Sequence, residues 1–157
     1  MSVDGPRKLK KGAVMDRKEW MGLLARAPAD ALDRLWRKLD LAPAYRWLRP
    51  PEVGGVMVRG RMGGTGAAFN LGEMTVTRCA LALDGGAVGH GYVQGRDKRQ
   101  AEQAALVDAL MQGDLAAHVR AALLAPLAAQ MQAARDLRAA KAAATRVEFF
   151  TLVRGDD

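Results

Sequence analysis

The chain has 157 residues, which is enough for one domain and too few for two comfortable ones. Half of the residues are apolar and the formal net charge is +7, with arginine commoner than lysine, so we expect an acidic ligand or partner. One cysteine excludes an internal disulfide. The cysteine and the two histidines of the chain cannot supply the four ligands of a structural zinc site without carboxylates.

Residues 1–15 are predicted to form a flexible basic tail ahead of a single domain over residues 16–157. Glycine and proline interrupt the charge run, which favours a solvated segment. The alternative is a nucleic-acid-binding arm, which the lack of interleaved aromatic residues disfavours. Neither the apolar segment of a secretory signal nor the about 20 apolar residues of a membrane span occur, so we expect a cytoplasmic protein without membrane contact.

Two amphipathic helices are predicted next. Asp16 and Glu19 have the spacing of a capping box at the start of the first helix. Pro28 suits the first turn of the second helix, which ends near residues 41–43. Apolar residues recur at helical spacing in both helices: Trp20, Leu23, Leu24 and Ala27, then Leu32, Leu35, Trp36 and Leu39.

The middle of the chain changes to the alternating pattern of β-strands. A short strand around Tyr45 and Trp47 is predicted to stop at Pro50-Pro51. Further strands are predicted over residues 53–62, 73–83 and 88–94, joined by a glycine-rich loop and by a hairpin turn over residues 84–86. The pattern therefore predicts an antiparallel meander of about four strands.

Helices return after the meander. Asp97 and Gln100 can cap a helix with an apolar stripe of Ala104, Val107, Leu110 and Met111. An alanine-rich helical stretch follows over residues 114–145, which Pro126 should kink or divide. Residues 146–154 alternate like a C-terminal strand. Helices that precede and follow an antiparallel meander along the sequence predict an α+β fold.

The first candidate site combines two arginines with a glycine-rich loop. Arg59 and Arg61 are two residues apart on a strand and share a face, and Gly63, Gly64 and Gly66 follow directly. Glycines let backbone N–H groups approach an anion, and arginines add fixed charge. The spacing is not that of a P-loop. The plainer interpretation is a tight turn with two solvated arginines.

The second candidate site is the start of the helix that Asp97 caps. Helix N-termini attract anions, and Arg96 and Lys98 would reinforce that attraction. A capping carboxylate, however, already occupies the free N–H groups. The alternative is a well-capped helix with a basic first turn.

The third candidate is the predicted C-terminal strand. Phe149 and Phe150 are adjacent and so place an aromatic ring on each face, with Arg154 further along. Either helices of this chain cover both faces, or one ring docks on a partner.

The remaining residues predict no catalytic or metal-binding group. A buried, inert thiol is expected for Cys79 in its strand. His90 and His118 have no carboxylate at metal-ligand spacing, and no known catalytic motif is present. The residues describe an arginine-rich, anion-tolerant domain without a self-sufficient active site.

Three separated motifs resemble one known family. They are residues 61–66 (RMGGTG), residues 95–98 (GRDK) with the helix through residues 108–112 (DALMQ), and residues 147–156 (VEFFTLVRGD). In this order they closely resemble PhnG, the small subunit of the bacterial carbon–phosphorus lyase core complex. The resemblance covers about residues 17–157, and the basic tail is outside it.

The resemblance implies work in a complex with PhnI, PhnH and PhnJ. With PhnI, PhnH and PhnL, the family attaches an alkylphosphonate to the ribose C1′ of ATP, and adenine leaves. PhnJ, which bears the iron–sulfur cluster, then cleaves the carbon–phosphorus bond. For the PhnG family itself the resemblance implies no catalytic residue and no cofactor of its own, with ATP as a substrate of the complex.

We hypothesise that the two arginine- and glycine-bearing motifs form either a polyanion-facing surface or a basic seam against an acidic partner, while Phe149, Phe150 and Arg154 contribute to a partner interface. The alternative is a stand-alone basic nucleotide- or RNA-binding module, which the lack of an RNP or KH signature disfavours. We do not expect a nucleic-acid partner. Apolar surface meant for partners would favour a homodimer of the isolated chain.

Overall fold

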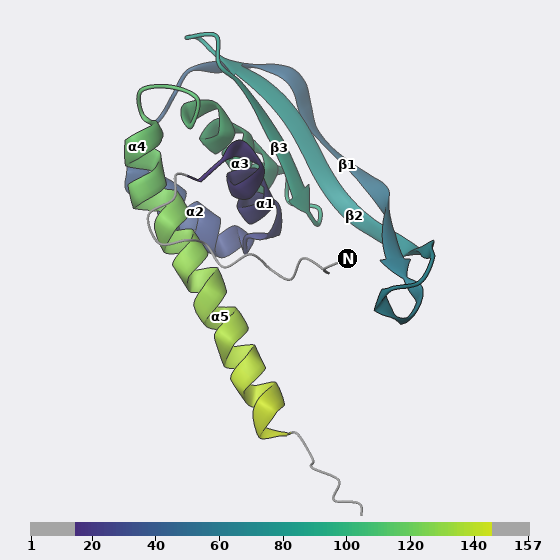
Figure 1. The fold of residues 1–157 in the computed structure, drawn as a ribbon. Helices are drawn as coiled ribbons and strands as arrows, with labels where there is room; N and C mark the ends of the chain where they lie inside the picture. Colours follow the sequence, from purple (N-terminus) through teal and green to yellow (C-terminus); the bar gives the residue numbers. More distant parts are fainter. Residues whose placement is uncertain (1–14, 146–157) are drawn as a thin grey trace, which may run out of the picture.

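A computed structural model describes residues 15–145 of the chain. Within that range, helices precede and follow an antiparallel sheet, so the predicted α+β class is confirmed (Figure 1). The predicted C-terminal strand over residues 146–154 lies outside the described residues. So does the predicted basic tail, apart from its last residue.

The first two helices are α1 (Arg17–Arg26) and α2 (Ala29–Leu39). The predicted capping box of α1 is confirmed: the Glu19 backbone N–H donates to Asp16 Oδ1 over 2.8 Å, and the Asp16 N–H donates to Glu19 Oε2 over 2.9 Å. Pro28 is the N-cap residue of α2. The buried faces of both helices join the hydrophobic core, which fixes their positions beside the sheet.

The sheet has three strands in the order β1-β2-β3, whereas the sequence pattern predicted about four. They are β1 (Tyr45–Arg61), β2 (Ala68–Leu83) and β3 (Val88–Gln94). The first two predicted strands are one, because Pro50-Pro51 does not end β1. Proline lacks an N–H donor, but β1 is an edge strand, and its pairing with β2 shifts register on both sides of Arg49.

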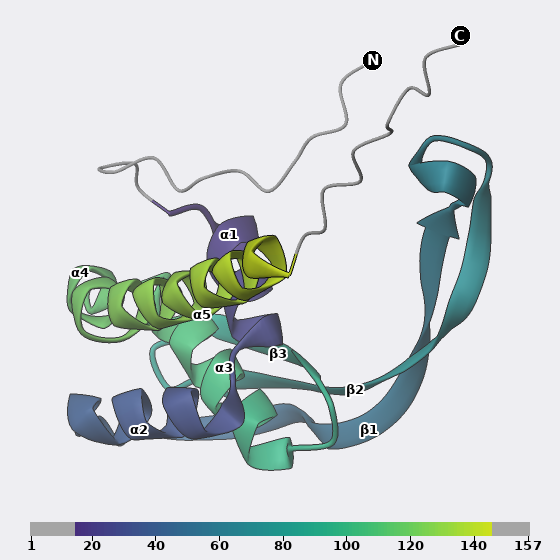
Figure 2. The ribbon, with the colours of Figure 1, turned by 90° about the horizontal axis from the view of Figure 1, so that it is seen from below.

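Strands β1 and β2 extend well beyond β3. Val76, opposite Gln94, is the first residue of β2 that pairs with β3, whereas β2 itself starts at Ala68, five residues earlier than predicted. Residues 55–75 therefore form a two-stranded projection, which we call the arm. A short 3₁₀ turn, η1 (Met62–Gly64), closes its tip. Figure 2 shows the arm bending out of the plane of the body strands, towards the side on which α1 and α5 lie.

Helix α3 (Lys98–Leu110) packs directly on the sheet and is buried on nearly every side. Its close approach depends on Gly89 and Gly91 of β3, because a Cβ atom at either position would collide with a carbonyl oxygen of α3. The predicted cap and apolar stripe of this helix are confirmed. Asp97 Oδ1 accepts from the N–H groups of Arg99 and Gln100 over 2.9 and 3.0 Å.

The alanine-rich region is divided near Pro126, as predicted. It contains α4 (Ala116–Val119), a π-helical turn over Arg120–Leu124 and α5 (Ala125–Ala144). The missing N–H of Pro126 and the steric demand of its ring disfavour a regular α-helix through this point, which accounts for the wider turn. No helix within residues 15–145 is long and apolar enough to cross a membrane.

Most of α5 leaves the body. Leu127 is fully buried and is the last buried residue of α5, whereas every residue from 132 to 145 is exposed. Figure 1 shows α5 and the arm extending in a similar direction, with α1 between them. The described part of the chain thus has a small body with two projections.

Candidate functional site

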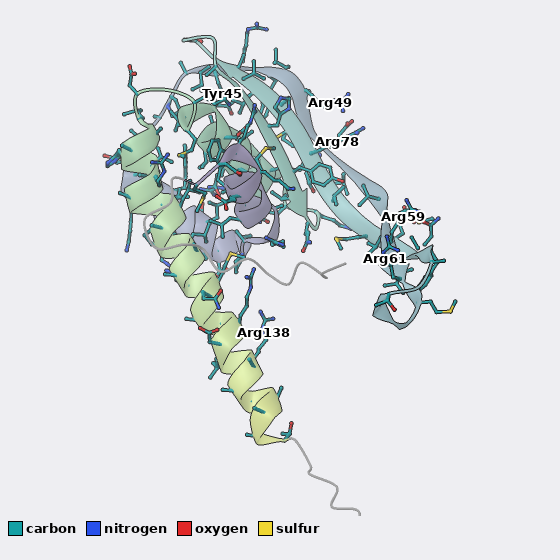
Figure 3. All side chains as sticks on the ribbon, viewed as in Figure 1. Tyr45, Arg49, Arg59, Arg61, Arg78 and Arg138 are labelled. Carbon is teal, nitrogen blue, oxygen red and sulfur yellow. The ribbon has the colours of Figure 1, made fainter. Side chains whose placement is uncertain are left out.

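The arginine- and glycine-bearing motif forms the tip of the arm. Arg59 and Arg61 are both exposed near the end of β1 (Figure 3). Gly63 and Gly64 have φ values of 58° and 81°, in the left-handed region that favours glycine, so the turn itself requires them. The guanidinium Nη1 of Arg61 donates to the Gly66 carbonyl over 3.1 Å, and the Gly66 N–H donates to the Met62 carbonyl over 2.8 Å. The loop is therefore closed by its own hydrogen bonds.

The second predicted motif lies at the base of the arm. The Gly95 N–H donates to the Thr75 carbonyl over 2.9 Å, and Thr77 Oγ1 donates to the Gly95 carbonyl over 2.8 Å, which fixes the turn between β3 and α3. The carboxylate of Asp97 accepts two N–H groups of the first helical turn. Arg96 and Lys98 remain exposed beside it. This geometry is that of a capped helix with a basic first turn.

The structure keeps these two motifs apart. Phe69 pairs with Gly60 at the tip, and Val76 pairs with Gln94 at the base, seven residues further along β2. At about 3.3 Å per residue, the separation along the strand is about 23 Å. One small anion cannot contact both motifs, although one extended partner surface can. Phe149, Phe150 and Arg154 lie outside the described residues.

The arm carries apolar side chains that no other described element covers. Met57, Met62, Phe69 and Leu71 are 63%, 72%, 42% and 66% exposed. A two-stranded ribbon is only marginally stable by itself in water, and clustered exposed apolar residues usually mark an interaction site. The arm therefore has the composition of a docking element, with the two arginines at its end.

One buried polar cluster was not predicted from the sequence. The carboxylate of Asp108 in α3 is fully buried and accepts four hydrogen bonds. Oδ1 accepts from Arg17 Nε over 3.1 Å and from Trp20 Nε1 over 2.9 Å; Oδ2 accepts from Arg17 Nη2 over 2.7 Å and from the backbone N–H of His90 over 2.9 Å. The hydrogen bond to Asp108 raises the pKa of Arg17 above its usual value. This cluster joins α1, α3 and β3 and leaves the carboxylate no free acceptor for catalysis.

Two other groups with chemical potential are also held in structural roles. Tyr45 Oη donates to Glu102 over 2.6 Å, and burial together with that hydrogen bond raises the pKa of Tyr45 to about 12. The expected buried thiol is confirmed for Cys79, which donates to the Ala101 carbonyl over 3.2 Å. Burial raises the pKa of Cys79 to about 11. Neither group is activated as an acid, base or nucleophile at neutral pH.

A small hollow lies between α1 and β3. Its volume is about 270 Å³, and its lining is mostly apolar, with one imidazole, that of His90. Residues 15–145 contain no cluster of three or more His, Cys, Asp or Glu side chains that could hold a metal ion. The described part of the chain thus presents docking and anion-attracting surfaces.

Comparison with known proteins agrees with the resemblance of the motifs. A family model described as phosphonate metabolism protein PhnG matches residues 15–155. A protein of Rhizobium meliloti (strain 1021), named alpha-D-ribose 1-methylphosphonate 5-triphosphate synthase subunit PhnG, is 45% identical over 157 residues, which are 99% of each chain. Both the family model and the relative cover almost the whole chain, so this chain belongs to the PhnG family.

Proposed function

We propose that this chain is a subunit of a ribose 1-methylphosphonate 5-triphosphate synthase complex and does not act alone. The observation that carries the proposal is the 45% identity to the Rhizobium meliloti subunit along 99% of both chains. At that identity and coverage, we infer that the two proteins share their fold. The protein therefore takes part in phosphonate metabolism as one component of an assembly.

The two projections support a role within an assembly. The arm presents apolar side chains to solvent, and β1 has a free edge along its whole length within the described sheet. Helix α5 presents Leu137, which is 58% exposed, on a segment that no other described element covers. Isolated helices and ribbons of this length gain most of their stability from packing, so both projections favour burial against partner subunits.

The basic charge of the chain fits the reaction that we propose for the complex. The family resemblance implies PhnI, PhnH and PhnJ as partners, with PhnL acting in the transfer of an alkylphosphonate to the ribose C1′ of ATP. ATP and the phosphonate are then substrates of the complex, and this chain supplies no cofactor. Its exposed arginines at the arm tip, Arg59 and Arg61, suit either these anions or acidic surfaces of partners.

Co-expression with PhnI, PhnH and PhnJ tests the proposal. We expect the chain to elute with them as one complex in size-exclusion chromatography. When this complex is supplied with PhnL, ATP and methylphosphonate, we expect it to release adenine from ATP. The variant Phe69→Ser with Leu71→Ser should weaken assembly, because it removes apolar side chains from the arm. Leu115→Ser is the matched control, since Leu115 is similarly exposed, at 42%, on the turn before α4.

Two results would contradict the proposal. One is an unchanged rate of adenine release when the chain is left out of the co-expression. The other is a chain that stays alone in every preparation and binds RNA with strong salt dependence, which would favour the nucleic-acid module instead.

A further inference from the structure

A groove at the root of α5 gathers three arginines that no sequence motif connects. It has a volume of about 400 Å³ and lies between α5, the corner where α1 meets α2, and the end of β3. Arg26 comes from the end of α1, and Arg135 and Arg138 come from α5. Figure 3 shows Arg138 on the side of α5 that faces the arm. Two segments that are distant in the sequence thus place guanidinium groups around one hollow.

The floor of the groove is firmly built. Leu127 is fully buried and Ala31 is 6% exposed, and both line the groove and belong to the core of the protein. Along α5 the lining residues Leu127, Met131, Ala134 and Arg138 follow each other at intervals of three or four, so they share one face of the helix. The helix backbone therefore places Arg138 on the same face as the apolar floor.

No described carboxylate neutralises these arginines. Five other arginines of the described chain form ion pairs, but Arg26, Arg135 and Arg138 have no described carboxylate oxygen within 4.0 Å. Asp33 of α2 is already engaged by Gln103, Arg37 and Arg99. The groove lining contains three arginines and two glutamines and not a single acid. Its local charge is strongly positive.

Arg34 brings a fourth guanidinium to the rim. Its Nη2 lies 3.4 Å from Oε1 of Gln130, a residue that lines the groove. Gln94, at the end of β3, also lines the groove. Arginine forks and amide N–H groups are the donors that bind phosphate oxygens in proteins, and an uncompensated group of them favours a ligand with several negative charges.

We propose that this groove binds a compact polyphosphate anion, with Arg26, Arg135 and Arg138 contacting its phosphate oxygens. The volume lies within the range of small-molecule sites, about 300–1,000 Å³. The choice of a triphosphate-bearing ligand rests on the proposed function, whereas the groove and its charge do not. The site is distinct from the arm tip, which lies on the other projection.

Titration calorimetry on the full-length chain tests this site, with inorganic triphosphate and ATP as probes. We expect both to bind and adenosine not to bind. The double variant Arg135→Ala with Arg138→Ala should weaken binding of both anions at least about tenfold, because each lost guanidinium removes charged hydrogen bonds. Both side chains are exposed, so the variant should keep the circular dichroism spectrum of the parent chain.

The matched control is Lys18→Ala with Arg46→Ala, which removes the same charge from exposed positions at the start of α1 and the start of β1, away from the groove. It should leave the affinity within about twofold, as expected for charges that are screened at a distance. An equal loss in both double variants would overturn the proposal in favour of diffuse surface charge. Loss of binding in Arg59→Ala with Arg61→Ala and not in the α5 variant would overturn it in favour of the arm tip.

The two proposals fail in different ways. If the chain never assembles with partner subunits, the proposed function fails while calorimetry on the isolated chain still decides the groove. If the complex assembles and releases adenine but neither anion binds the groove, the function stands and the groove proposal is wrong. A dissociation constant for adenosine equal to that for ATP would also overturn it, because recognition would then not involve phosphate.

Discussion

Replacing Asp108 by Asn tests whether the buried carboxylate holds the body together. The substitution keeps the size of the side chain, so it opens no cavity, but it turns one acceptor oxygen into an NH₂ donor. In either orientation of the amide, two of the four donors that now bind Asp108 lose their acceptor. One of the two always belongs to Arg17, which is 45% exposed and can be solvated. The other, from Trp20 or the His90 backbone, is left without an acceptor.

An unsatisfied buried donor costs about 1–3 kcal/mol, and the partly solvated guanidinium adds less than that. We therefore expect Asp108→Asn to lower the free energy of unfolding by about 3 kcal/mol, out of a total of about 5–15 kcal/mol for a domain. Urea unfolding of the full chain, followed by circular dichroism and tryptophan fluorescence, measures this loss. With a slope of about 2 kcal/mol per molar, the midpoint should fall by about 1.5 M.

The matched control is Asp136→Asn, because Asp136 is exposed and accepts only from Gln132 in the described structure. Its unfolding free energy should stay within about 0.5 kcal/mol of the parent value, as for most surface substitutions. A loss under about 1 kcal/mol for Asp108→Asn would refute the reasoning, since it would mean that the four hydrogen bonds contribute little to the fold.

Three further predictions concern the sheet and the helix that packs on it. Gly91→Ala should lower the free energy of unfolding in urea by about 1–3 kcal/mol, because the new Cβ would collide with α3. Gly72→Ala is the control, since Gly72 has open space around it and the substitution should leave the free energy of unfolding unchanged. Equal losses in the two variants would contradict this prediction. In the folded chain Cys79 should react very slowly with a thiol reagent at pH 8, because a pKa of about 11 leaves about one thiolate in a thousand. In urea the same thiol should react at once. Rapid labelling of the native protein would contradict the burial of Cys79. The folded state holds the Tyr45 proton up to a pKa of about 12, so its contribution to stability is present below pH 10 and is lost as the pH rises from about 10 towards 12. The difference in unfolding free energy between the parent and Tyr45→Phe should shrink over that window, and a constant difference would show that the Tyr45 proton is not linked to folding.

The local parts of the fold could be predicted because their signals are local. Asp16 with Glu19, and Asp97 with the next turn, satisfy N–H groups within three residues, so spacing alone reveals them. Pro126 likewise acts on the residue four positions earlier. The strand through Pro50-Pro51 was mispredicted because the outcome depends on whether β1 has a neighbour on both sides. Only the sheet order shows that it is an edge strand.

The candidate sites were less predictable than the fold. Both predicted motifs were located correctly on a turn and at a helix start, but their separation depends on how far β2 extends beyond β3. Asp108 gave one available signal, a charged residue in the middle of an apolar helix. Its partners Arg17 and Trp20 are about 90 positions away in the sequence, so no spacing rule connects them. The arginine groove is assembled from α1 and α5 in the same manner.

The two projections differ in what they can offer. Beyond residue 132 the backbone groups of α5 are bonded within the helix, so α5 can interact only through side chains, and its arginines favour anions. The arm has, in addition, the free edge of β1, where backbone N–H and C=O groups can pair with a partner strand. Pro50 and Pro51 interrupt the row of N–H donors along β1 next to the body, which favours such pairing along the part of β1 that follows them. This arrangement favours a division of roles, in which the arm holds a partner subunit and the root of α5 holds a ligand.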